Sequence, residues 1–159
     1  MQFKLSLAVA AMLTVAASDR YNGPRPPQPD IPYLLHADRL VQTEVADARE
    51  QGGKKESTFV IPGASSPART PLAEPIFLMR TKDISPDSLE LYRLEVRNGQ
   101  REVVISQRKR GRGDYGPFHL MVNRIEGDLY RVEADEPLPD GEYSLSPNGS
   151  NKVFCFEIY

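Results

Sequence analysis

The segment from residue 85 to residue 107 constrains this chain most, because its pattern predicts a β-hairpin. It reads SPDSLELYRLEVRNGQREVVISQ, and Asn98-Gly99 divides it into two alternating halves. This dipeptide favours the two-residue turn in which both central residues have positive φ. A fold that contains such a hairpin needs further strands to cover its apolar face.

Counting outwards from the turn gives the register of this hairpin. It predicts three pairs on one face: Val96 with Arg101, Leu94 with Val103, and Tyr92 with Ile105. That face is mostly apolar, so we expect it in the core. A slip of one residue would turn the apolar side chains to solvent together, which favours this register.

The rest of the chain repeats short extended segments between turn residues. Its fourteen prolines disfavour helix interiors and central strands. The polar stretch ADAREQGGKKES, residues 46–57, is typical of an exposed loop. We therefore predict an all-β fold, an antiparallel β-sandwich of about seven to nine short strands.

The last segment, KVFCFEIY, predicts a strand with two distinct faces. Phe154, Phe156 and Ile158 alternate on one face and are expected in the core. Cys155, the single cysteine, points to the other face. A reactive thiol needs a nearby cation, metal or helix N-terminus to lower its pKa, and no sequence feature predicts one here. We interpret Cys155 as structural.

The N-terminal segment, residues 1–17, is typical of a signal peptide. Lys4 precedes an apolar run, and Val15 and Ala17 match the small residues of a cleavage site. The run is shorter than the roughly 20 residues of a membrane-spanning helix. A buried N-terminal helix is the alternative. We predict export, with a secreted or periplasmic location and no transmembrane segment in the mature chain.

Residues 18–32 form a proline-rich linker in this interpretation, and residues 33–159 form one domain. Five prolines in NGPRPPQPDIP, residues 22–32, predict an extended, semi-rigid segment. It would act as a tether or as a strap along the domain edge. A docking peptide for a proline-recognising partner is the alternative.

The stretch LPDGEYSL, residues 138–145, resembles the tyrosine corner of immunoglobulin-like sandwiches. That resemblance implies that the Tyr143 hydroxyl hydrogen-bonds back across the turn. Together with SPARTPLAEPIFL, the hairpin halves LYRLEV and REVV on either side of Asn98-Gly99, and VFCF, the stretch also resembles a group of uncharacterised secreted bacterial proteins, from about Ile31 to Tyr159. This second resemblance implies an immunoglobulin-like β-sandwich and no particular chemistry.

Catalytic and metal-ligating patterns are weak in this sequence. His36 and Asp38 have ligand spacing on a strand, and His119 would have to join them from another strand. A dyad of Cys155 with His119 is a further alternative, with less support. The default for both histidines is a surface or half-buried position, so we predict no catalytic residues, no metal and no cofactor. Asn148-Gly149-Ser150 matches a glycosylation sequon but is also a turn signal.

A basic segment follows the predicted hairpin. Its cations are Arg108, Lys109, Arg110 and Arg112. One interpretation is a solvated loop or a guarded sheet edge. The other is a contact for an anionic partner, such as lipid head groups, acidic polysaccharide or an acidic protein patch.

These observations predict a non-catalytic binding or structural module of the cell envelope, with a protein or an anionic envelope component as partner. The net charge of −2 gives no indication of nucleic-acid binding. The alternatives are a small extracytoplasmic enzyme with a site in the loops at one end of the sandwich, or a subunit of a larger envelope assembly.

Overall fold

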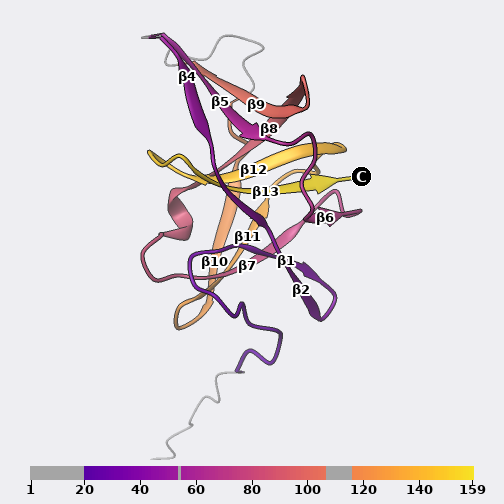
Figure 1. Cartoon of the computed structure of the whole chain (residues 1–159). Helices are drawn as coiled ribbons and strands as arrows, with labels where there is room; N and C mark the ends of the chain where they lie inside the picture. Colours follow the sequence, from indigo (N-terminus) through magenta and orange to yellow (C-terminus); the bar gives the residue numbers. More distant parts are fainter. Residues whose placement is uncertain (1–19, 54, 107–115) are drawn as a thin grey trace, which may run out of the picture.

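A computed structural model describes residues 20–53, 55–106 and 116–159 of the protein. In this part of the chain there are thirteen β-strands and one short 3-10 helix, η1 (Pro86–Ser88), arranged in two sheets (Figure 1). The all-β, antiparallel fold predicted from the sequence is confirmed, whereas the predicted number of strands is too low.

The smaller sheet has five strands in the order β10 (Leu120–Glu126), β11 (Leu129–Ala134), β7 (Ile76–Arg80), β1 (Tyr33–His36) and β2 (Arg39–Gln42). The larger sheet has the order β3 (Glu44–Asp47), β13 (Lys152–Ile158), β12 (Gly141–Pro147), β8 (Leu89–Arg97), β9 (Gln100–Ser106), β5 (Glu56–Pro62) and β4 (Arg49–Gly52). The short β6 (Arg69–Thr70) adds to it by pairing in parallel with β13.

The main core lies between the two sheets. Phe77 of the smaller sheet packs edge-on against Phe156 of β13, with ring centroids 4.9 Å apart. Tyr143 of β12 stacks on the same ring at 5.4 Å. Phe154 and Ile158 belong to this buried cluster, so the predicted core face of the last strand is confirmed. Aromatic pairs of this kind add to the burial of their apolar surface.

The larger sheet also curls back on itself. Its two edge strands, β3 and β4, are consecutive in the chain and are separated by Ala48 alone. The Ala48 N–H donates to the carbonyl of Asn151 beside β13 (2.8 Å), and the next residue, Arg49, pairs with Val60 of β5. One stretch of chain thus joins both edges, and the sheet closes into a barrel of six strands when β3 and β4 are counted as one.

The barrel interior is a second, smaller core. It contains five buried side chains: Ala48, Ile61, Leu94, Val153 and Cys155. Strands β8, β12 and β13 therefore bury both faces, one towards the smaller sheet and one towards the barrel interior. This explains why both faces of these strands carry mostly apolar or small side chains.

The hairpin of β8 and β9 has the predicted register at its turn. Glu95 pairs with Glu102 and Val96 with Arg101, and Asn98 and Gly99 have φ of 51° and 73°. Val96 is nevertheless 50% exposed. The reason is that β12 pairs with β8 only as far as Leu94, so Val96 lies on the part of β8 that extends beyond β12.

Further from the turn the hairpin departs from the prediction. The ladder between the two strands covers Glu95–Arg97 and Gln100–Glu102 only. Beyond it β8 stays with β12, while β9 continues beside β5 as far as the pair of Ser106 with Glu56. The expected pairs of Leu94 with Val103 and of Tyr92 with Ile105 are therefore wrong, because the two strands follow different neighbours and diverge.

One of the strands that the sequence did not predict is β4. Within residues 46–57, expected as a loop, Arg49–Gly52 forms β4 and pairs with β5. All four residues of β4 are exposed, so no apolar alternation marks the strand in the sequence. Backbone hydrogen bonds do not depend on side-chain polarity, and the neighbouring strand is enough to hold this segment extended.

The proline-rich residues 20–32 lie along the smaller sheet. Pro29 bridges to Arg80 of β7, and the Asp30 N–H donates to the Arg80 carbonyl (2.7 Å). The Asp30 carboxylate in turn accepts the backbone N–H groups of residues 82–84 at 2.8–3.0 Å. Arg25 forms an ion pair with Glu126 at the end of β10. This part of the chain is hereafter called the N-terminal strap.

Candidate functional site

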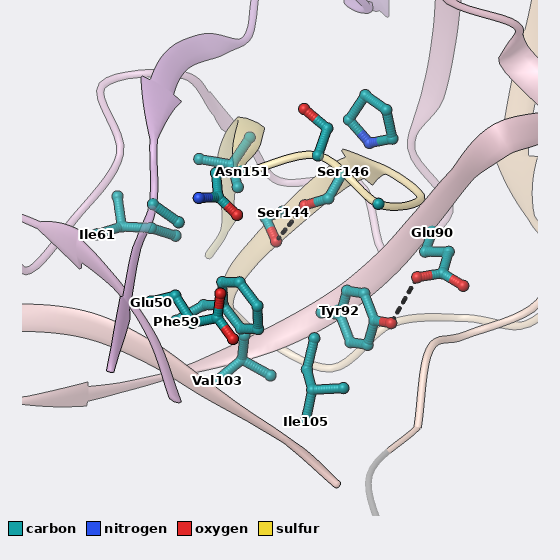
Figure 2. Close-up of a pocket in the computed structure, with 15 residues that line it drawn as sticks. Glu50, Phe59, Ile61, Glu90, Tyr92, Val103, Ile105, Ser144, Ser146 and Asn151 are labelled. Carbon is teal, nitrogen blue, oxygen red and sulfur yellow. Dashed lines mark hydrogen bonds between the residues drawn. The ribbon is translucent and has the colours of Figure 1, made fainter. Parts of the chain in front are cut away.

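A pocket of about 230 Å³ opens where β8 and β9 diverge (Figure 2). Tyr92 of β8 and Ile105 of β9 both line it, although the sequence predicts that they pair with each other. The other walls come from β4, β5, β12 and the turn between β12 and β13. The pocket is therefore the open end of the barrel.

The deeper wall of the pocket is apolar. Phe59 of β5 and Val103 of β9 are paired neighbours that point inwards, and Ile61 and Val153 lie beside them in the barrel core. A cavity of about 150 Å³ is enough to hold benzene. The pocket can therefore take a single ring or a short branched chain with a polar substituent.

Two hydroxyl groups of β12 give this wall a polar strip. Ser144 is buried and Ser146 is half-buried, and the Ser146 hydroxyl donates to Oγ of Ser144 at 3.4 Å (Figure 2). Among the described residues the Ser144 hydroxyl makes no other side-chain hydrogen bond. A hydroxyl has one donor and two acceptor positions, so the strip can both donate to a ligand and accept from it.

Two carboxylates flank the pocket. Glu90 accepts a hydrogen bond from the Tyr92 hydroxyl (2.6 Å) and a longer one from Asn148 Nδ2 (3.4 Å). Glu50, on the opposite side in Figure 2, accepts from the Ser57 hydroxyl (2.6 Å). These neutral donors orient the carboxylates without cancelling their charge.

The other end of the barrel is closed by Arg101. Its side chain is fully buried and forms two hydrogen bonds with the Glu44 carboxylate, at 2.6 and 2.9 Å. It also donates to the carbonyls of Pro62 and Gly63. Burial alone would raise the pKa of Glu44, but the hydrogen bonds from Arg101 and Ser66 and the positive charge of Arg101 together outweigh it and hold the pKa below its usual value.

Glu142 completes the closed end. It lies 3.7 Å from the Arg101 guanidinium and accepts the Ser66 N–H. Burial raises its pKa, although these two neighbours act in the opposite direction. Arg101 thus satisfies a buried polar cluster at one end of the barrel, and the pocket occupies the other end.

Cys155 lies inside the barrel and is fully buried. Burial raises the pKa of its thiol to about 12, despite the opposing effect of the Arg101 guanidinium. A thiol in this environment is almost entirely protonated at neutral pH and is a poor nucleophile. Its surroundings are those of a packed side chain.

The Tyr143 hydroxyl donates to the carbonyl of Pro139 (2.6 Å). This is the hydrogen bond across the turn that a tyrosine corner requires. The ring is buried between the sheets, so Tyr143 ties the start of β12 to the loop before it. Burial raises its pKa.

The histidines considered from the sequence are not brought together. His36 and Asp38 lie at the edge of the smaller sheet that β1 and β2 form, whereas His119 precedes β10 at the opposite edge. His119 Nδ1 is 2.9 Å from the Asp135 carboxylate on the surface, away from the buried Cys155. In the described part of the chain, no three His, Cys, Asp or Glu side chains form a group that could hold a metal.

The predicted anionic-partner contact lies outside the described residues, since Arg108, Lys109, Arg110 and Arg112 all fall within 107–115. The same is true of the predicted signal peptide. Asn148 of the sequon is exposed in the turn after β12.

Sequence reasoning did not identify the pocket. One signal for it is present in β12, where Ser144 and Ser146 alternate with the core residues Tyr143 and Leu145. Val153 and Cys155 alternate with the core phenylalanines in the same way. A second face made of small and apolar residues, with few charges, indicates a face that another part of the chain covers.

Comparisons with known proteins gave no match, whether with family models, with curated proteins or with solved structures. Within residues 20–53, 55–106 and 116–159, no helix is long and apolar enough to span a membrane.

Proposed function

We propose that this protein is a non-catalytic binding module of the cell envelope, and that it binds a small molecule in the pocket between β8 and β9. The observation that carries the proposal is the divergence of these strands over a cavity of about 230 Å³. A concave apolar cavity with a few convergent polar groups is the usual form of a ligand site. Its volume suits a ligand smaller than a typical drug.

We infer that the fold is of the immunoglobulin-like type. Strands β1, β7, β11 and β10 correspond in order to A, B, E and D of such a sandwich, and β8, β12 and β13 correspond to C, F and G. The corner at Tyr143, at the start of the strand equivalent to F, supports the same assignment.

In this scheme β4 and β5 are an insertion between the strands equivalent to A and B. The insertion pairs with β9 and curls over the outer face of the larger sheet. It contributes Glu50 and Phe59 to the pocket. An addition to a common sandwich that builds a cavity supports a binding role for that cavity.

The envelope location rests on the sequence of residues 1–17, which we propose to be removed on export. A contact of the basic segment with an anionic envelope component, or with a protein, remains part of the proposal. In a fractionated culture we expect the protein outside the cytoplasm, with Ser18 as its first residue by N-terminal sequencing. A cytoplasmic protein that starts at Met1 would contradict the location.

The binding role is tested by screening the purified protein against small aromatic and branched aliphatic compounds by saturation-transfer NMR. We expect several compounds to bind, and binding to be lost in Val103→Phe, which fills the pocket. Val104→Phe is the matched control, because the neighbouring side chain points outwards and is 52% exposed.

Unchanged ligand spectra after prolonged incubation are expected of a binding module, whereas conversion of the ligand would favour the enzyme alternative. If no compound binds to the folded protein, or if both variants bind equally well, the proposed function is wrong.

A further inference from the structure

Among the described residues that line the pocket, the charged side chains are all acidic. Glu50 and Glu90 are its acidic lining residues, and the described lining contains no lysine, arginine or histidine. Neither glutamate takes part in an ion pair among the described residues. The hydrogen-bond donors that orient them, Ser57, Tyr92 and Asn148, are neutral.

Both carboxylates retain the capacity to accept more hydrogen bonds. An ionised carboxylate has about four lone-pair positions. Glu90 uses two of them, one of which is the long contact of 3.4 Å with Asn148, and Glu50 uses one with Ser57. A donor with a positive charge would form shorter and stronger hydrogen bonds there than a neutral one.

The apolar walls suit the rest of such a ligand. Phe59 and Tyr92 present aromatic rings beside the two carboxylates (Figure 2), and aromatic faces attract organic cations. Val103 and Ile105 supply the aliphatic surface between them. An apolar body carrying an ammonium group would contact both kinds of surface at once.

From this arrangement we propose that the ligand is a small organic cation, namely a primary amine on a single ring or a short branched chain. The ammonium group hydrogen-bonds to Glu90 or Glu50, and the apolar body packs against Phe59, Tyr92 and Val103. The inference rests on the proposed function, because it specifies the ligand class of the same pocket.

The test compares three probes of similar shape that differ in charge: 2-phenylethylamine, 2-phenylethanol and 3-phenylpropanoate. Dissociation constants are measured by NMR titration at low and at high salt. We expect the amine to bind about tenfold more tightly than either other probe at low salt. Salt should reduce this preference, because ions screen the partly exposed carboxylates.

Variants connect the preference to the two glutamates. In the double variant E50Q/E90Q we expect amine affinity to fall about tenfold, while the affinity for the alcohol changes less than about twofold. The single variants show which carboxylate contributes more. Glu74→Gln is the control, because this exposed glutamate before β7 does not line the pocket but carries the same charge.

The outcomes separate the two proposals. Binding of the alcohol or the carboxylate as tight as that of the amine overturns the ligand class and leaves the binding function in place. An amine preference that survives in E50Q/E90Q also overturns it. If none of these probes and no compound of the wider screen binds, both proposals fail.

Discussion

Arg101 places a full positive charge at the closed end of the barrel, with no exposed side-chain surface. Removing one partner of a buried ion pair leaves the other charge uncompensated, which costs more than the pair itself contributes. Here two carboxylates, Glu44 and Glu142, and two carbonyl groups depend on one guanidinium. The free energy of unfolding should therefore depend strongly on this single side chain.

We expect Arg101→Met to lower the free energy of unfolding by about 3–5 kcal/mol. Arg97→Met, on the same hairpin, is the matched control, since Arg97 forms exposed ion pairs with Glu95 and Glu102. It should cost less than about 1 kcal/mol. Urea unfolding followed by circular dichroism measures both. Similar losses in the two variants would show that the buried cluster is not critical to stability.

The hairpin of β8 and β9 shows how far local pattern predicts an element. Asn98-Gly99 determines the turn and the register of the pairs beside it, because that geometry is contained in adjacent residues. The divergence after Glu95 could not be predicted in the same way. It depends on β12, which pairs with β8, and on β5, which pairs with β9. Both of these strands lie far from the hairpin in the sequence.

The N-terminal strap is an element held by a few polar contacts. Burial would raise the pKa of Asp30, but hydrogen bonds from the backbone N–H groups of Ile84, Lys82 and Asp83 outweigh it and lower the pKa below its ordinary value of 3.8. The folded protein therefore binds a proton at Asp30 less readily than the unfolded chain does. Its contribution to stability is complete above the unfolded pKa and disappears as the pH falls through the lower, folded pKa.

We expect Asp30→Ala to lower the free energy of unfolding by about 1–2 kcal/mol near neutral pH, because three backbone N–H groups lose a charged acceptor. As the pH falls below the ordinary value of 3.8, the difference between this variant and the natural protein should shrink. Asp47→Ala, at an exposed position of β3, is the control. A difference that stays constant from neutral to acid pH would argue against the carboxylate as the anchor of the strap.

At the scale of the whole molecule, the sequence predicted the core between the sheets but not the barrel. Alternation in β12 and β13 reports which residues are buried, since the phenylalanines and Tyr143 form a regular apolar face. Closure depends on Ala48, which joins two edges of one sheet, and on β4, whose residues are all exposed. Neither feature produces a periodic pattern in the sequence. The barrel and its pocket therefore could not be predicted from the sequence and are found only in the structure.

The proposed binding function requires that a ligand binds in the pocket at the open end of this barrel. Amide chemical-shift mapping with 2-phenylethylamine tests this most directly, because it locates binding residue by residue without altering the protein. We expect the largest shifts on the pocket walls, around Phe59, Tyr92, Val103 and Ser146, and small shifts throughout the five-stranded sheet. Shifts concentrated on the five-stranded sheet, or spread evenly over the surface, would contradict binding in this pocket.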